Sequence, residues 1–396
     1  MFDQSDTRSM AVVLGGYVNG YSIVRELREQ GVPSIWLLDS RRSLASYSNR
    51  IDGYTLVQWE TNSLRQALVH LSQQHGRLVL FPTSDEQLEI LHAIHDDVCG
   101  FCFLPFNRES LLASIDKSVQ YAHCERLGVP YPRSMELSLE RGLATLEGLK
   151  FPVIIKPRKR DDATTDVFRS LLLEGQSDLD RHRRALEAFM RGGIGFLASE
   201  LVPGDDTQIY AYTAYRSPRG QILNEWIGKK LTQYPDRFGV FSSASNEAPE
   251  QVRELGRRLV EGMDLHGITE PEFKYDARDD TFKLMEVNLR SMMWNRLGNR
   301  SGVCLQFAQW QDALGRPVQE QTQERSRRVH LVYMKHEIVN LLSRWSYWRN
   351  FAHNLFGGDE RHFAIFDWHD IGPAIRDLRS YPRAMVSAWL KRLKMR

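Results

Sequence analysis

The chain has 396 residues, 42% of them hydrophobic and 26% charged, which excludes a disordered chain and indicates a folded protein of two to three domains. Its 52 basic and 50 acidic residues leave a formal net charge of +2, so no chain-wide field favours nucleic acid. No apolar stretch is long enough to span a bilayer, and the first residues lack the basic and apolar regions of a signal peptide, so we expect a cytoplasmic protein that binds no nucleic acid.

Strands and helices alternate over about the first 110 residues. Residues 11–15, AVVLG, read as a buried strand, and a helix to about residue 30 leads to a second strand, SIWLLD. Two further helix–strand units end in RLVLFP and FCFLPF. This alternation predicts a parallel sheet. A dinucleotide site is a weaker alternative, because Tyr17 in GGYVNG stands where the Rossmann fingerprint requires its second glycine.

Polar residues follow two of these strands, AVVLG and RLVLFP. Open parallel sheets bind ligands at the carboxyl ends of their strands, so these residues are candidates for a substrate pocket, in which the two acids could hold an ammonium group. The alternative is that Ser84 caps a helix whose first turn carries both acids. The candidates are Asn19, Ser84, Asp85 and Glu86.

A group of histidines and cysteines lies in and after the helix that precedes FCFLPF. Four such side chains within eleven residues could hold zinc. We favour instead a helix followed by a core strand, because only one CxxC pair is present, and we expect the four cysteines of the chain to be reduced thiols. The group consists of His92, His95, Cys99 and Cys102.

From residue 114 on, strands and helices no longer alternate regularly, which predicts an α+β arrangement. This part contains the strand FPVIIKP, a long charged helix, and the hairpin ITEPEFKYDARDDTFKLMEVNLR. On the second strand of the hairpin, strict alternation separates a polar face from the apolar face of Met285, Val287 and Leu289. The first strand offers Glu272 and Lys274 to meet the polar face. The residues expected on that polar face are Leu284, Glu286, Asn288 and Arg290.

The register of this hairpin decides which acids meet. A three-residue loop at 278–280 places Glu272 opposite Glu286, whereas a two-residue loop places Glu272 opposite Met285. Like charges directly opposite each other repel, so the first register needs a cation between the carboxylates. Magnesium suits this position, since it commonly takes one or two carboxylates, and Asn288 adds a neutral oxygen. A solvated hairpin face is the alternative.

These motifs resemble those of the ATP-grasp superfamily, especially its carboxylate–amine ligases, over roughly residues 11–318. LMEVNLR is similar to the family's Glu-x-Asn-x-Arg strand. The resemblance implies that Glu286 and Asn288 hold Mg²⁺, for which Mn²⁺ can substitute, with Glu272 as the upstream metal ligand. It also implies that Arg290 steadies the acyl phosphate or the carboxylate.

The same resemblance implies an ATP site. One lysine follows the aspartate at the entry to the ATP domain, a second ends VIIKP, and ASELVPG resembles the hinge that receives adenine and is followed by a ribose-binding residue. The family's glycine-rich lid loop is replaced by KPRKRDDATTDVF, where the side chains of residues 158–160 could replace amide donors. The implied ATP-binding residues are Lys117, Lys156, Arg158, Glu200, Leu201, Val202 and Gln208. Catalytic roles near the γ-phosphate and acyl group fall to Arg290, Lys230 and Lys229, with the choice between the lysines open.

The expected fold is therefore an α/β and α+β chain with four parts. An N-terminal parallel-sheet (pre-ATP-grasp) domain at 1–113 precedes a lid subdomain at 114–202, a large ATP-grasp subdomain at 203–320 and a basic, aromatic extension at 321–396. The implied reaction activates a small carboxylate as an acyl phosphate and couples it to an amine. The alternatives are carboxylation or phosphate transfer without an amide product, and a non-enzymatic nucleotide-binding module.

The C-terminal end is strongly basic. Between Arg376 and Arg396 there are seven lysines and arginines and one acid, Asp377. Such a tail could contact an anionic membrane or a partner, but we favour a solvated helix packed on its own enzyme. Homo-oligomers are compatible with the sequence.

Overall fold

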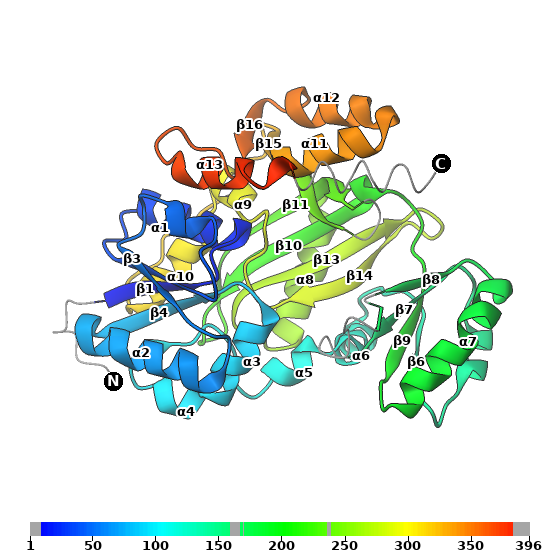
Figure 1. The fold of residues 1–396 in the computed structure, drawn as a ribbon. Coiled ribbons are helices and arrows are strands. Elements are labelled where there is room, and N and C mark those ends of the chain that lie inside the picture. Colours follow the sequence, from blue (N-terminus) through cyan, green and yellow to red (C-terminus); the bar gives the residue numbers. More distant parts are fainter. Residues whose placement is uncertain (1–8, 159–166, 169, 236–238, 383–396) are drawn as a thin grey trace.

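The computed structural model describes residues 9–158, 167–168, 170–235 and 239–382. They form three sheets with helices packed around them, and Figure 1 shows the small sheet as a separate lobe beside the main body. The predicted Lys159 and Arg160 of the lid loop, and most of the basic tail, lie outside the described residues. No helix in the described part of the chain combines the length and apolarity needed to cross a membrane.

The N-terminal sheet is entirely parallel, as the alternating pattern predicts. Its five strands have the order β3-β2-β1-β4-β5. They are β1 (Ser9–Leu14), β2 (Ile35–Asp39), β3 (Gly53–Leu56), β4 (Arg77–Pro82) and β5 (Cys102–Phe103). The helices of this part are α1 (Val18–Glu29), η1 (Ala45–Tyr47), α2 (Thr61–His75), α3 (Asp85–Ala93) and α4 (His95–Val98).

The central strand β1 is apolar throughout because both of its faces are covered. Val12 and Leu14 pack in one core with residues of α2 and α3, whereas Ala11 and Val13 pack in another with residues of α1. A strand buried on both sides reads as a continuous apolar run, which is why the sequence pattern identified it. The carboxyl ends of β1 and β4 lie toward the large sheet, because Asn19 and Asp85, which follow these strands, contact Ser291 and Arg290 after β14 (Thr281–Asn288).

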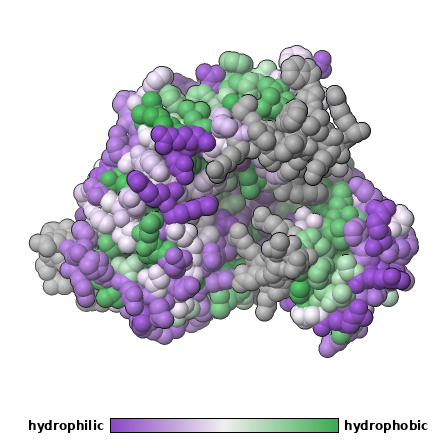
Figure 2. All heavy atoms as spheres, viewed as in Figure 1, coloured by the Kyte–Doolittle hydropathy of each residue, from purple (hydrophilic) through white to green (hydrophobic). Residues whose placement is uncertain are grey.

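The smaller lobe, where the lid subdomain was predicted, contains an antiparallel four-stranded sheet with the order β6-β9-β7-β8. One face is covered by α7, whose buried residues Leu179, Leu186 and Met190 share a core with Phe196. Figure 2 shows a mainly hydrophilic outer side around α7 and more apolar residues on the side toward the large sheet. The elements are β6 (Ser134–Leu137), η2 (Leu143–Gly148), β7 (Val153–Pro157), β8 (Leu171–Leu173), α7 (Gln176–Arg191) and β9 (Phe196–Glu200).

The large sheet has seven strands in the order β14-β13-β10-β11-β12-β15-β16. Its pairs are antiparallel except β15–β16. The helices α6 and α8 pack together against it. The elements are α5 (Leu111–Ile115), α6 (Lys117–Leu127), η4 (Asp206–Gln208), β10 (Ile209–Arg216), β11 (Ile222–Tyr234), β12 (Val240–Ser245), α8 (Glu250–Gly262), β13 (Gly267–Asp276) and β14 (Thr281–Asn288).

The predicted extension at 321–396 contributes two strands to this same sheet and contacts the N-terminal domain. Asp370 is buried, and its side chain accepts hydrogen bonds from the Tyr21 hydroxyl at 3.0 Å and the Asn49 backbone at 3.0 Å. The four predicted domain boundaries stay predictions. The remaining elements are α9 (Arg296–Arg300), α10 (Leu305–Ala313), β15 (Val329–Val332), α11 (Met334–Ser343), η5 (Trp345–Tyr347), α12 (Trp348–Phe356), β16 (Glu360–Phe363) and α13 (Gly372–Leu378).

Candidate active site

The hairpin β13–β14 places Glu272 directly opposite Glu286, as predicted, but for a different reason. Four residues, 277–280, connect Asp276 and Thr281, which are paired, so the predicted three-residue loop is wrong. This register alone would set Glu272 opposite Met285. A β-bulge corrects it: Phe273 pairs with Leu284 and Glu272 with Glu286, so Met285 is the extra residue.

The bulge also changes which residues share a face. Leu284, expected on the polar face, lies in the hydrophobic core with Phe282, and on the other side of the bulge Val287 and Leu289 occupy the same core. Strict alternation cannot place all four together, because an inserted residue shifts the side-chain period by one. The switch of apolar positions from even to odd at Met285 was the sequence signal for this bulge.

Two lysines from different elements hold the opposed carboxylates. The Nζ of Lys117, at the start of α6, lies 2.7 Å from Glu286 Oε2. The Nζ of Lys230, on β11, lies 2.5 Å from Glu272 Oε2, and both of these side chains are less than 10% exposed. Helix α6 is fixed against the hairpin because the side-chain amide of Gln120 exchanges hydrogen bonds with the backbone N and O of Val287.

The electrostatics of the site follow from these pairs. The charge of Lys117 lowers the pKa of Glu286 well below its usual range, against the opposing effect of burial, and Lys156 and Lys230 add to the decrease. Burial acts to lower the pKa of Lys117 and Lys230, but the charges of Glu286 and Glu272, respectively, raise the pKa of each lysine above its usual value. Glu286 is therefore ionised, and Lys117 and Lys230 are protonated, at neutral pH.

Glu270 is a further acid of this site that the sequence pattern had not singled out. It lies opposite Asn288, is fully buried, and accepts hydrogen bonds from the Thr213 hydroxyl at 3.1 Å and the Trp294 indole at 2.9 Å. Burial, with the charge of Glu272 second, raises its pKa to about 8. Its two-residue spacing from Glu272 on one strand was the available signal, since such residues share a face.

The donor set of Glu272, Glu286 and Asn288 fits a hard divalent cation. The two carboxylates face each other, and the side-chain nitrogen of Asn288, a residue only 7% exposed, has no hydrogen-bond partner among the described residues. Carboxylate and amide oxygens are ligands that Mg²⁺ accepts, and the Asn288 amide is not held in place through its nitrogen.

Lys229 and Lys230, which the sequence could not rank, lie on opposite faces of β11. Lys230 contacts Glu272, one of the opposed carboxylates, whereas the Nζ of Lys229 lies 3.6 Å from Glu247 in a different hollow. Lys156 is the last residue but one of β7 in the smaller lobe, and its charge reaches Glu286. The structure therefore brings Lys117, Lys156 and Lys230 together and leaves Lys229 apart.

The other residues predicted for ATP surround the end of the lid. Arg158 Nη2 donates to Asp116 Oδ2 at 3.2 Å, next to Lys117. Glu200 is the last residue of β9, and its carboxylate accepts a hydrogen bond from the backbone N–H of Lys150 at 2.9 Å. After it, Leu201 is half-buried and Val202 is buried, and Gln208 ends η4. Lys274 Nζ donates to the Gly204 carbonyl at 2.7 Å, so the hairpin is tied to this connecting segment.

The candidates at the N-terminal sheet contact the end of the hairpin. Ser84 is the N-cap of α3 in a capping box with Gln87, which confirms the capping alternative. Asp85 accepts from Arg290 Nε at 2.7 Å and Nη2 at 3.2 Å. The remaining candidates are Glu86, which is exposed, and Asn19, whose Nδ2 donates to the Thr83 and Ser291 carbonyls.

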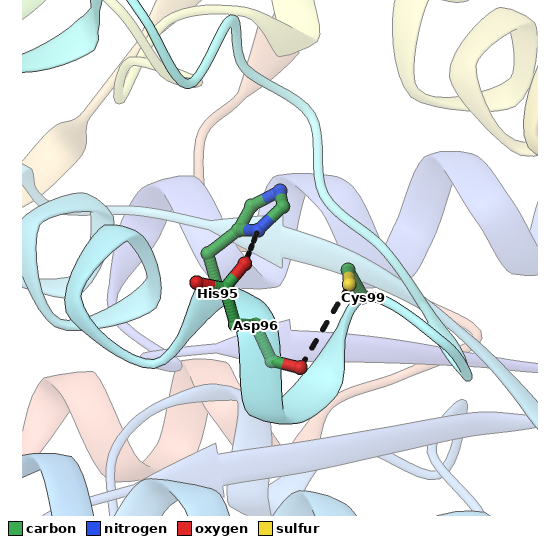
Figure 3. A group of neighbouring side chains, drawn as sticks. All are labelled: His95, Asp96 and Cys99. Carbon is green, nitrogen blue, oxygen red and sulfur yellow. Dashed lines mark hydrogen bonds and ion pairs between the residues drawn. The ribbon is translucent and has the colours of Figure 1, made fainter.

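The four histidines and cysteines considered as an alternative zinc site are not brought together as a set of four among the described residues. Figure 3 shows His95, Asp96 and Cys99, whose potential ligand atoms lie within 4.8 Å of one another. Cys102 instead is buried in β5. Asp96 accepts two hydrogen bonds from Arg108, at 2.5 and 2.7 Å, so its carboxylate is already paired. The structure favours the helix followed by a core strand.

Comparison with known proteins gives a consistent result. No family model matches the chain. It is 24% identical over 299 residues to a D-aspartate ligase of Enterococcus faecium (strain Aus0004), covering 70% of each protein. A D-alanine–D-alanine ligase of Acidiphilium cryptum (strain JF-5) is 23% identical over 303 residues, covering 72% of this chain and 89% of that protein.

The fold is shared with solved structures. The ADP complex of N5-carboxyaminoimidazole ribonucleotide synthetase superposes with a TM-score of 0.65 at 15% sequence identity, covering 86% of this chain and 85% of that one. At this level of sequence identity the likeness shows a shared fold. This confirms the predicted fold class. The four-stranded lobe lies beside the large sheet, and the hairpin β13–β14 forms one edge of that large sheet.

Proposed function

We propose that the protein is an ATP-dependent carboxylate–amine ligase, which activates a small carboxylate as an acyl phosphate and joins it to an amine. The observation that carries the proposal is the pair of opposed carboxylates, Glu272 and Glu286, each held by a lysine from another element. The similarity to two ligases that are named for joining or activating amino acids supports the same reaction class.

ATP and a divalent ion are the cofactors that this site suits. Glu272, Glu286 and Asn288 would hold Mg²⁺, or Mn²⁺ in its place, and the bound ion would supply charge neutralisation at the phosphate oxygens. Lys117, Lys156 and Lys230 carry three positive charges on α6, β7 and β11, and a polyphosphate requires such charges from several directions. Arg158, Gln208 and the segment 200–202 remain the candidates for the rest of the nucleotide.

The first half of the proposed reaction transfers the γ-phosphoryl group. A carboxylate oxygen of the substrate attacks the γ-phosphorus, and the bond to the ADP oxygen breaks, which leaves an acyl phosphate and ADP. In the second half an unprotonated amine attacks the acyl carbon, phosphate leaves, and the amine loses a proton. Such chemistry asks the protein mainly for positioning and for stabilisation of charge.

Arg290 is the candidate for positioning the acyl group. Its guanidinium is held from one side by Asp85 of the N-terminal domain, so its orientation is fixed before a substrate binds. A guanidinium in a fixed plane matches the geometry of a carboxylate or an acyl phosphate. Asp85 is thereby proposed as a positioning residue, in place of the predicted ammonium contact.

The experiment that tests the function is ADP release. Amino acids and other small carboxylates are paired with amines in the presence of ATP and Mg²⁺, and products are identified by mass spectrometry. We expect ADP release that requires both a carboxylate and an amine, with an amide of the matching mass. ADP release with a carboxylate or bicarbonate alone, without an amide, would favour another ATP-grasp reaction, and no ADP release with any mixture would favour a nucleotide-binding module.

A further inference from the structure

A second cavity, of about 250 Å³, lies where α1, α9 and β16 meet. These three elements come from the N-terminal domain, the segment after the metal hairpin and the C-terminal region. Figure 1 shows them on the side of the molecule away from the lid. None of the residues proposed above for ATP, the metal ion or the acyl group lines this cavity.

The lining of this cavity is strongly basic. It contains four arginines and two histidines but only one carboxylate, that of Asp367. Asp367 is itself engaged, because Arg50 Nη2 lies 2.6 Å from its Oδ2. The basic residues are Arg25, Arg296, Arg300, Arg361, His362 and His369.

Arg25 is a buried cation without a carboxylate of its own. It is 2% exposed, and its terminal nitrogens donate only to the backbone carbonyls of Phe363 and Ala364. No acidic oxygen lies within 4.0 Å of its guanidinium among the described residues, and its Nε has no hydrogen-bond partner there. Burial, with the charge of Arg296 second, lowers its pKa to about 9. A buried guanidinium in this state gains from a neighbouring anion.

The second buried cation, Arg296, shares its acid with two others. Arg296 is 1% exposed, its Nε has no partner among the described residues, and its Nη2 lies 2.6 Å from Glu29. Glu29 is also contacted by Arg50 at 2.9 Å and by Arg300 at 3.3 Å. Glu29 is therefore shared by three guanidinium groups, of which Arg50 also has Asp367 and Asp370 as acidic partners. The arginines around the cavity still outnumber these carboxylates among the described side chains.

The mouth of the cavity carries an aromatic side chain that faces water. Trp368 is 79% exposed, and its ring packs edge-on against Phe366 at 4.6 Å between centroids. Both rings line the cavity together with Phe363. An exposed indole beside arginines offers a flat surface on which a ring can stack.

We propose that this cavity binds the phosphoryl group of a small phosphorylated molecule, with the ring or apolar part of that molecule against Trp368. The guanidinium groups supply forked N–H donors that match phosphoryl oxygens, and a dianion compensates the excess of positive charge better than a single carboxylate does. The site is separate from the proposed nucleotide site, so it can be occupied together with ATP.

The test uses phenyl phosphate and inorganic phosphate as probes for the full-length protein. The nucleotide site is first saturated with Mg²⁺ and a non-hydrolysable ATP analogue, and binding is followed by calorimetry and by tryptophan fluorescence. We expect saturable binding of phenyl phosphate, and weaker binding of inorganic phosphate. The double variant Arg300→Gln, Arg361→Gln should weaken both by about tenfold or more, since each charge-assisted hydrogen bond contributes on that scale.

Two matched variants separate the parts of the proposal. Arg184→Gln, an exposed arginine on α7 in the lid, should leave binding unchanged. Trp368→Ala should weaken phenyl phosphate but not inorganic phosphate, and unchanged binding of phenyl phosphate would overturn the stacking contact. The phosphoryl site itself is refuted by absence of saturable binding, or by equal affinity in the double variant when its melting temperature is unchanged.

Discussion

Replacing Glu286 by glutamine separates its structural contribution from its proposed role at the metal. The Lys117–Glu286 contact is 2.7 Å long, but the two side chains are 23% and 36% exposed. Solvent screening reduces such a pair to about 1 kcal/mol. For a chain of this length we therefore expect the melting temperature of Glu286→Gln without ligand to fall by only about 1–2 °C.

The effect on ligand binding should be larger. A ligand present at about 100 times its dissociation constant stabilises the native state by about 2.7 kcal/mol. In Glu286→Gln we expect most of the stabilisation by Mg²⁺ and a non-hydrolysable ATP analogue to disappear. Turnover should fall by more than about 100-fold, because metal-ion stabilisation of a transferring phosphoryl group is worth several kcal/mol.

The assay is thermal unfolding with and without the nucleotide analogue and Mg²⁺, followed by ADP release. Glu247→Gln is the matched control, since Glu247 lies 3.6 Å from Lys229 on the other face of the same sheet and should not alter the ligand response. If Glu286→Gln kept the full Mg²⁺-dependent stabilisation and turnover, the metal assignment would be refuted.

Three further predictions address the lysines, Arg290 and the pH dependence of stability. Lys230→Met should abolish turnover and cost about 3–5 kcal/mol of stability, because it leaves Glu272 buried and unpaired. Lys229→Met, on the other face of β11, should retain turnover within about twofold. Equal losses of ADP release in both variants would contradict the placement of the two lysines on opposite faces. Asp85→Asn should reduce kcat/KM for the carboxylate by about tenfold or more while leaving nucleotide affinity unchanged, and the exposed Glu86→Gln serves as its control. Burial lowers the pKa of His336 to about 4, so His336 takes up its proton at a higher pH in the unfolded chain than in the folded protein. As pH falls from 7 to 5, this difference lowers the free energy of unfolding by about 2 kcal/mol. His336→Gln should flatten that part of the profile of melting temperature against pH, and an unchanged slope would contradict the assignment.

Much of the fold was accessible from the sequence because it rests on local patterns. Strands buried on both faces read as apolar runs, and β1 and β4 were found in this way. Lys117 and Lys156 were found from short motifs that place a lysine at a helix start and a strand end. The structure brings both lysines to Glu286, although 169 residues separate Lys117 from it.

The features that the sequence did not predict depend on packing between distant segments. The pair Asp85–Arg290 joins residues 205 positions apart, and no local pattern specifies such a contact. The addition of β15 and β16 to the large sheet is equally non-local. The bulge at Met285, in contrast, was predictable, because the switch of apolar positions between Leu284 and Val287 is present in the sequence. The bulge was not predicted because strict alternation was assumed along the whole strand.

The contact between the C-terminal region and the first helix has a consequence for how the protein is made. Asp370 accepts hydrogen bonds from Tyr21 and Asn49, and Arg25 of α1 donates to the backbone just after β16. While the ribosome is still synthesising the middle of the chain, α1 lacks these partners. The N-terminal domain can therefore reach its final packing only after residue 370 has emerged, so it cannot complete its fold as an independent unit during synthesis.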